Sequence, residues 1–381
     1  MAKVFIESSN IISSLGFTTK ENIENVLAEK SGVLIYDDSS ISKTPLPLSR
    51  IDDIQLNKEL VSIDSPELYT RFEKLCILSL QKTLAESKID ITDKRTIFIL
   101  STTKGNIDLL DKTKENHFDK DRATLWKAAE VIADYFKACN KPIIISNACI
   151  SGVNALILGK RLIDEGSYDN AIITGADVLS KFVVSGFQSF LSLSPTLCRP
   201  FDINRSGLNI GEGVATVILS KNEDIITDQK IELVDGATHN DANHISGPSR
   251  TGEGLFLSIN NTLKNHNITI DCISAHGTAT PYNDDMESKA IMRSGLENVP
   301  VNSLKGYFGH TLGAAGVIES IISIEALKQN TLIKTLGFSD FGVAEPITIS
   351  DKTEKRELKT LLKLASGFGG CNAAALFVKH V

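Results

Sequence analysis

The order of strand-like and helix-like segments is the feature of this sequence that most limits its fold. Short β-branched runs alternate with longer amphipathic stretches, a pattern typical of α/β proteins. Twice, two strand-like runs follow each other with a glycine-rich link and no helix, at AIITGA to VATVILS and at LLKLASGF to AAALFVK. Strands joined without a helical crossover can pair antiparallel, so we expect two similar halves, each with a mixed five-stranded sheet.

Each half is expected to contribute five strands layered with helices. The strand-like runs are KVFIES, TIFILS, PIIIS, AIITGA and VATVILS in the first half, and IELVDGA, CISAHG, VPVNS, LLKLASGF and AAALFVK in the second. Helices are expected near residues 66–87, 122–138, 150–164, 253–265, 284–294 and 313–329. The halves divide into residues 1–221 and 222–381, and no linker rich in Pro, Gly or Ser separates them, which predicts one compact body.

Two segments lack this periodicity. Residues 37–66 contain three prolines and are expected to form a loop-rich excursion on the surface. The polar residues 104–122 are expected to be solvated or to lie at an oligomer edge.

Composition excludes several classes of protein. No run of eighteen apolar residues exists, so no membrane span is expected, and the start MAKVFIESSN lacks the basic and apolar regions of a secretory signal. The six cysteines include no CxxC pair, which predicts free thiols in a reducing cytoplasm. A net charge of -7 disfavours nucleic acid as the main partner.

One cysteine stands where a strand gives way to a helix, in KPIIISNACISGVNALILGKRLIDEG. Cys149 is expected in the first turn of that helix, where unpaired N–H groups and the dipole favour a thiolate. Taken alone, a buried structural cysteine is the commoner role for such a residue.

Two histidines change that balance. His276 and His310 each follow a strand and precede a helix, as Cys149 does, and such loops are where α/β folds place their chemistry. The three side chains are therefore expected to converge. Lys305 lies in the His310 loop among glycines, and a buried ammonium there would help to keep the imidazole neutral.

Two glycine-rich segments accompany these residues. GLNIGEG (207–213) leads into a strand and not from a strand into a helix, so it is no nucleotide loop, and GxxxxGK[ST] is absent. SGFGGCN (366–372) could present backbone N–H groups to a thioester oxygen, although it could equally be only a tight turn. A zinc site from the cysteine and the two histidines is conceivable, but without a CxxC or HxxxH pair no metal is expected.

Together these motifs closely resemble the β-ketoacyl-acyl carrier protein synthases, in the branch that uses one cysteine and two histidines. The resemblance runs from end to end through NACISG, RPFDINRSGLNIGEG, AHGTATPYND, SLKGYFGHTLGAAG and SGFGGCNAA. It implies a thiolase-like α/β fold, with the nucleophile in the first half and both histidines in the second. Relatives with a His–Asn pair are disfavoured because the second motif carries His310.

The resemblance also implies a role for each site residue. Cys149 takes an acyl group from a carrier thioester, its N–H and that of Phe368 form the oxyanion hole, and His276 and His310 stabilise the enolate left by malonyl decarboxylation. Lys305 tunes and orients His310. Phe368 also gates the acyl pocket. The phosphopantetheine arm is expected to contact Thr278, Thr280, Phe368 and Gly369, and the supporting acidic residues are Asp284 and Glu287.

The implied reaction is a decarboxylating Claisen condensation in fatty-acid or specialised polyene or polyketide-type synthesis. No cofactor is expected, since 4′-phosphopantetheine enters on the acyl carrier protein. A homodimer is expected, and an active half of a heterodimer with a silent chain-length partner stays open. A thiolase is disfavoured because Cys371 follows the glycines, where the family usually has threonine, which implies a structural role.

Several positions depart from the family pattern. Ser366 stands where the family usually has Phe, and Leu208 stands where an aromatic residue is usual. The helix that often carries basic residues for the carrier protein has Glu67 near that position, with only Arg71 and Lys74 nearby. These departures favour a dedicated carrier protein or a specialised pathway.

Overall fold

The computed structural model of the chain describes residues 2–113, 115–241, 244 and 247–380. One ten-stranded sheet runs through the molecule in the order β11-β10-β14-β15-β9-β1-β8-β6-β4-β5. Its N-terminal strands are β1 (Phe5–Ile12), β4 (Thr96–Ser101), β5 (Ile143–Ile145), β6 (Asn170–Asp177) and β8 (Gly213–Ser220). Its C-terminal strands are β9 (Ile231–Asn240), β10 (Cys272–Ser274), β11 (Val301–Asn302), β14 (Thr360–Gly367) and β15 (Cys371–Lys379).

The two halves of the sheet share one topology. Numbered by chain order within its half, each set of five strands is arranged 3-2-4-5-1 from the outer edge inward. The two sets meet at β1 and β9, where Phe5 pairs with Glu232. In both halves the last two strands, β6 with β8 and β14 with β15, are antiparallel, whereas the outer strands pair in parallel. The expectation of two similar mixed five-stranded sheets is confirmed.

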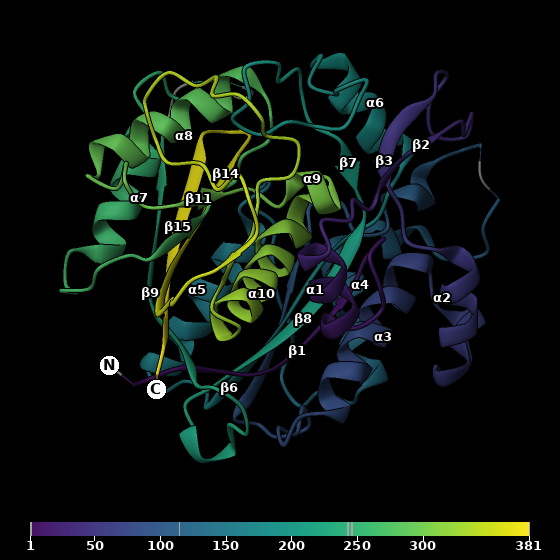
Figure 1. The fold of residues 1–381 in the computed structure, drawn as a ribbon. Helices are drawn as coiled ribbons and strands as arrows, with labels where there is room; N and C mark the ends of the chain where they lie inside the picture. Colours follow the sequence, from purple (N-terminus) through teal and green to yellow (C-terminus); the bar gives the residue numbers. More distant parts are fainter. Residues whose placement is uncertain (1, 114, 242–243, 245–246, 381) are drawn as a thin grey trace.

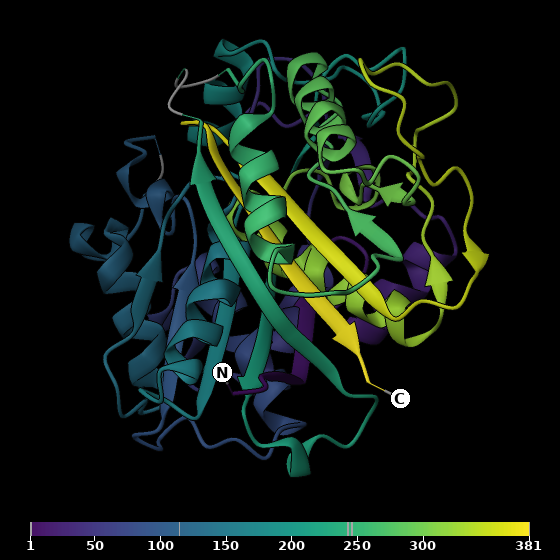
Figure 2. The same cartoon turned by 90° about the vertical axis from the view of Figure 1, so that its left-hand side faces the viewer.

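Helices cover both faces of the sheet, and two of them lie between its two halves, which stay joined at β1 and β9. Figure 1 shows α5 and α10 at the centre of the molecule, with α3 and α4 on one side and α7 and α8 on the other. Seen from the side in Figure 2, α7 lies across β9 and β15. The helices are α1 (Thr19–Leu27), α2 (Asp53–Glu59), α3 (Arg71–Ala85), α4 (Leu125–Tyr135), α5 (Ser151–Asp164), α6 (Lys181–Ser189), α7 (Glu253–Leu263), α8 (Pro281–Arg293), α9 (Lys305–Phe308) and α10 (Ala315–Lys328).

The apolar residues form a core for each of these layers. The largest cluster surrounds α5 and α10, a second lies under α3 and α4, and a third lies under α7 and α8. Along α10 apolar residues occur on every side of the helix, because it is buried all round between the two halves of the sheet. None of the helices in the described residues is both long enough and apolar enough to cross a membrane.

The expectation for residues 37–66 is wrong. They contain α2 and the buried strand β3 (Leu46–Ser49), which pairs with β2 (Val33–Tyr36) and with β7 (Ile210–Gly211) in a three-stranded sheet. Residues 104–122, apart from residue 114, which lies outside the described residues, are mostly exposed or half-buried. A further pair joins β12 (Thr331–Leu332) to β13 (Glu354–Lys355). Short 3₁₀ helices occupy Leu60–Ser62, Pro66–Leu68, Ile107–Leu110, Lys120–Ala123, Glu223–Ile225 and Leu312–Ala314.

Candidate active site

Equivalent corners of the two halves carry Cys149 and His310. Cys149 lies between β5 and α5, and His310 lies between β11 and α10, so each follows the third strand of its half and precedes a central helix. His276 follows β10, the neighbour of β11 in the sheet. One sulfur and one nitrogen atom of each ring all lie within 4.8 Å of one another, so the expected convergence is present.

The cysteine lies in a tight corner just before α5. Ala148 adopts a positive φ of 44°, and the Ser151 hydroxyl closes the turn by donating to the Ala148 carbonyl at 2.6 Å. The glycine-rich loop packs against this corner, since a Cβ on Gly367 would lie 3.0 Å from the Cys149 nitrogen. From the same loop the Phe368 N–H donates a hydrogen bond to the Cys149 thiol. Two backbone N–H groups therefore lie beside the sulfur.

The thiol does not have the low pKa that a place in the first turn of a helix predicts. Helix α5 begins at Ser151, two residues beyond Cys149. Burial, and next the neighbouring Cys371, raise the pKa of the Cys149 thiol to about 12, although Lys305 and the Phe368 N–H act in the opposite direction. In this structure desolvation outweighs the helix end, and the thiol is protonated at neutral pH.

The segment GLNIGEG holds the backbone of His310. The His310 N–H donates to the Asn209 carbonyl at 2.7 Å, and the Gly211 N–H donates to the His310 carbonyl at 3.0 Å. A side chain on Gly211 would collide with the Phe308 carbonyl at 2.1 Å, which explains the glycine. As expected, this segment leads into a strand, and its role in the structure is to fix the histidine loop.

A buried carboxylate holds the His276 loop. Glu287 on α8 accepts the N–H groups of His276 at 2.7 Å and of Gly277 at 2.6 Å. Its neighbour Asp284 accepts the N–H groups of Phe201 at 2.8 Å and of Thr278 at 3.0 Å. Burial raises the pKa of Glu287 to about 7 and that of Asp284 to about 6. Both residues support the loop from behind the pocket.

The two imidazoles face each other and are neutral. Their ring centroids are 5.1 Å apart and the ring planes are nearly perpendicular, at 87°. Burial holds the pKa of both His276 and His310 well below the usual histidine range, and the next largest cause is the ammonium of Lys305. A neutral imidazole can donate an N–H without carrying a full charge.

Lys305 is fully buried, and its ammonium pairs with Glu319 on α10. The opposite carboxylate oxygen of Glu319 accepts from Lys363 at 2.7 Å. The expected contribution of Lys305 to a neutral His310 agrees with the lowered pKa of the imidazole. The side chain that Lys305 binds is nevertheless Glu319, which the sequence did not single out.

A pocket of about 270 Å³ opens onto the thiol and both imidazoles. The hydroxyls of Thr278 and Thr280 lie 2.8 Å apart, and both residues line the pocket together with Gly369. Phe368 stacks on Phe187 with ring centroids 5.5 Å apart and meets Phe190 edge-on at 5.3 Å. The aromatic side chains beside the thiol therefore belong to two elements, the glycine-rich loop and α6 with the residue after it.

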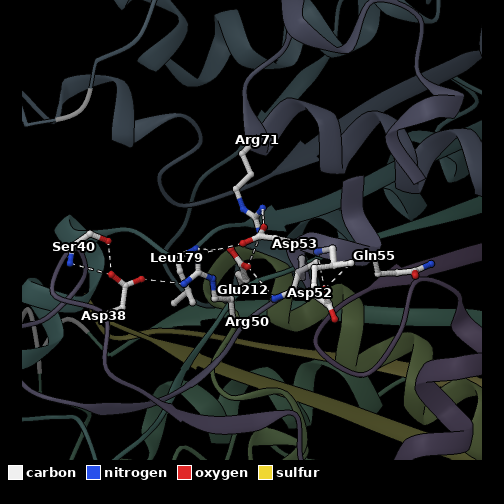
Figure 3. A network of polar contacts seen from close by, with 11 residues as sticks. Asp38, Ser40, Arg50, Asp52, Asp53, Gln55, Arg71, Leu179 and Glu212 are labelled. Carbon is white, nitrogen blue, oxygen red and sulfur yellow. Dashed lines mark hydrogen bonds and ion pairs between the residues drawn. The ribbon is translucent and has the colours of Figure 1, made fainter. Parts of the chain in front are cut away.

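The expected basic residue Arg71 is half-buried and engaged in a network of ion pairs. Figure 3 shows its guanidinium between Asp53 and Glu212, with the Glu212 oxygen 2.8 Å away. Glu212 is itself buried and also accepts the N–H groups of Ile51 at 2.9 Å and Leu179 at 3.1 Å. The arginine ties α3 to the GLNIGEG segment, so it is not a freely available cation for an acidic carrier protein.

The sequence matches two protein families, which together span most of the chain. The family described as "Beta-ketoacyl synthase, N-terminal domain" matches residues 6–225, and the one described as "Beta-ketoacyl synthase, C-terminal domain" matches residues 232–339.

Relatives and solved structures agree with these matches. A 3-oxoacyl-[acyl-carrier-protein] synthase 2 of Coxiella burnetii is 25% identical over 403 residues, which cover 97% of either protein. A 3-oxoacyl-[acyl-carrier-protein] synthase 2 of Rhizobium meliloti is 32% identical over 254 residues, 62% of this chain and 60% of the relative. A chain from the structure of a ketosynthase (ApeO) in complex with its chain length factor (ApeC) from Xenorhabdus doucetiae has a TM-score of 0.89 and 26% identity, covering 100% of this chain and 98% of that chain.

Proposed function

This chain belongs to the β-ketoacyl synthase family, and we propose that it condenses an acyl group held on Cys149 with a malonyl group on an acyl carrier protein. The observation that carries the proposal is the convergence of one thiol and two neutral imidazoles on a single pocket. The relatives named 3-oxoacyl-[acyl-carrier-protein] synthases support the reaction class. The products are a β-ketoacyl-carrier thioester and carbon dioxide.

The first half-reaction transfers the acyl group. The Cys149 sulfur attacks the thioester carbonyl of the acyl carrier, and the carrier thiol leaves with the proton that Cys149 gives up. The N–H of Phe368 already points at the sulfur, and together with the Cys149 N–H it forms the oxyanion hole for the tetrahedral intermediate. Because burial keeps the resting thiol protonated, the bound thioester is required before the sulfur becomes a nucleophile.

The second half-reaction forms the carbon–carbon bond. The malonyl carboxylate leaves as carbon dioxide, and its electron pair passes to an enolate whose oxygen accepts N–H groups from His276 and His310. The enolate carbon attacks the acyl-Cys149 carbonyl, the carbon–sulfur bond breaks with its electron pair going to sulfur, and the released thiolate takes up a proton from solvent to restore the thiol. Burial of both imidazoles excludes water, which strengthens these hydrogen bonds. No strong side-chain base is needed, because decarboxylation supplies the carbanion.

The substrate arrives on a flexible arm. We assign Thr278, Thr280 and Gly369 to the phosphopantetheine arm of the carrier, because they line the pocket. We assign the gate to Phe368, because its side chain lines the pocket and contacts the rings of Phe187 and Phe190. Ser366 and Leu208, where the family usually has larger aromatic residues, line the same pocket, and we propose that they adapt it to a specialised acyl chain.

Acylation of Cys149 is the direct test of this function. Incubated with acyl carrier thioesters of several chain lengths, the protein is expected to gain the mass of one acyl group, as measured by intact-protein mass spectrometry. The Cys149→Ala variant, which keeps the pocket but lacks the sulfur, is expected to gain none. Coenzyme A thioesters are the matched donors that distinguish a thiolase. An adduct that persists in Cys149→Ala, or no adduct with any donor, would falsify the proposal.

We further propose that this chain pairs with a second copy of itself through β5. This strand ends the ten-stranded sheet, and its three isoleucines are only half-buried. An unpaired edge strand is a natural surface for sheet extension. Since the thiol, both histidines and Lys305 are retained, this chain supplies a complete active site. A different subunit is the alternative occupant, as in the complex of the ketosynthase ApeO with its chain length factor.

A further inference from the structure

A second buried lysine lies behind the histidine pair. Lys363, on β14, is fully buried, and its ammonium donates to Glu319 at 2.7 Å and to the carbonyls of Ala275 at 3.3 Å and Ser274 at 3.4 Å. Those two carbonyls belong to the residues directly before His276. The lysine therefore binds the end of the strand that carries the histidine.

The strand register brings Lys363 to this position. Lys363 pairs with Ser274 across β14 and β10, and its neighbours Leu362 and Leu364 belong to the core under α7 and α8. Because side chains alternate along a strand, Lys363 points the other way, toward Glu319 on α10. A fully buried lysine is rare unless it is paired. Here one carboxylate is shared by two ammonium groups, so the cluster of Lys305, Glu319 and Lys363 holds one more cation than anion.

We propose that Lys363 is a positioning residue that fixes the His276 loop and supplies an additional positive charge beside the two imidazoles. The inference rests on the proposed function and names a residue that supports its second half-reaction. The extra charge disfavours protonation of the imidazoles, which must stay neutral to donate N–H groups to the enolate. It also partly offsets the negative charge that the malonyl group brings to a site shielded from water.

The pKa directions of the rings agree with this geometry. Burial lowers the pKa of Lys363 itself, and the Glu319 carboxylate acts against burial by favouring the charged ammonium. Lys363 is among the causes that lower the pKa of both His276 and His310, after burial and Lys305. Glu287, which holds the His276 loop, also interacts with Lys363. Loss of this lysine would therefore raise the pKa of the Glu287 carboxyl as well as the pKa of the two imidazoles. The pKa of each imidazole therefore has to be measured separately from that of Glu287. The charged and titratable groups around the two rings are Cys149, Asp284, Glu287, Lys305, Glu319 and Lys363.

The test is the Lys363→Met variant, which replaces the ammonium by a slightly shorter, unbranched and uncharged side chain and leaves Glu319 paired with Lys305. Histidine-ring NMR titration is expected to show the pKa of His276 and His310 rising by about one unit. The condensation rate is expected to fall about tenfold at neutral pH, because the His276 loop loses the bonds that Lys363 makes to the Ser274 and Ala275 carbonyls. The rate of Cys149 acylation is expected to change little, because none of these bonds reaches the thiol corner. Lys160→Met is the matched control: Lys160 is also buried, and its partner is Asp164 at 2.5 Å on the same helix.

Each outcome decides the inference. Unchanged ring pKa values and an unchanged condensation rate in Lys363→Met would overturn it, as would an equal effect of Lys160→Met. Lys363→Gln, which keeps a donor for the carbonyls but no charge, is the second variant, and it is expected to shift the ring pKa values as Lys363→Met does. If neither variant folds, the role is structural only. If the wild-type chain takes up no acyl group, the proposed function fails instead, and the ring titration still reports on Lys363.

Discussion

At the scale of single residues, the site combines a protonated thiol with neutral imidazoles. Burial raises the pKa of Cys149 and lowers that of both histidines, because the charged form of each group is disfavoured away from water. The same desolvation strengthens hydrogen bonds to a developing oxyanion. Reactivity in this pocket therefore depends on what occupies it, since the resting groups carry no charge of their own.

Alkylation of Cys149 is expected to report its raised pKa. A raised pKa means that the thiolate fraction, and with it the rate of modification by iodoacetamide, increases about tenfold per pH unit between pH 7 and 9 without reaching a plateau. Site-resolved mass spectrometry gives the rate in a Cys139→Ser background, which removes the exposed cysteine. A rate that levels off near pH 7 would show a stabilised thiolate and contradict this account of the corner.

The residues of the site were predicted from the sequence more fully than the groups behind them. Cys149, His276 and His310 follow strands, and that position is readable from local pattern. Glu319 and Lys363 were missed, although each is a charge within an apolar run, VIESII and LLKLA, which is itself an informative signal. Their pairing joins a helix to a strand 44 residues away, which no local pattern encodes.

At the scale of elements, the close crossing of α5 and α10 holds the two catalytic corners together. A Cβ on Gly152 would lie 2.7 Å from the Val317 nitrogen, and one on Gly316 would lie 2.4 Å from the Val153 nitrogen. The two backbones touch where the helices begin. Each helix directly follows a catalytic loop, so the distance between Cys149 and His310 is set by this contact.

Gly152→Ala is expected to lower the free energy of unfolding by about 1–3 kcal/mol. The added methyl meets backbone atoms, so the helices must move apart, and condensation is expected to slow more than the loss of stability alone predicts. Chemical denaturation and steady-state rates measure the two effects. Gly186→Ala in α6 is the control, because nothing lies within 4 Å of its Cβ position. Equal stability of the two variants would contradict a tight crossing.

The sheet strands were predicted better than the small elements around them. All ten expected runs are strands of the large sheet, because each is apolar and is buried by helices that precede or follow it. The buried strand β3 was missed since one of its two partners, β7, lies far along the chain, where Leu48 pairs with Ile210. A four-residue strand that contains a proline and has a distant partner has no local signature. Helix α6 was missed as well, and it contributes Phe187 to the pocket.

At the scale of the whole molecule, the chain is two copies of one topology joined along one sheet. The strand order 3-2-4-5-1 occurs in both halves, and α5 and α10 occupy equivalent places. The division at residue 221, between β8 and β9, stays a prediction. The outer edges of the sheet are β5 and β11, and of these β5 belongs to the half with the nucleophile.

Association through β5 is expected to give a particle of two identical chains, measured by native mass spectrometry. Ile144→Asp places a carboxylate on the edge strand, where like charges would face each other across the interface, so it is expected to yield monomers. Val61→Asp, at a side chain that is 87% exposed and distant from that strand in the sequence, is the control and is expected to stay paired. A monomeric wild-type chain, or one that pairs only with a different subunit, would contradict the homodimer.

The shared active site also has a consequence for synthesis on the ribosome. The nucleophile is made with the first half of the chain, and both histidines are made with the second. At about 5–20 residues per second, translation of residues 222–381 takes on the order of ten seconds, during which α5 lacks α10. For that interval the apolar face of α5 and the Cys149 thiol are open to solvent and to chaperones. Docking of the second half buries this thiol and brings His276 and His310 beside it.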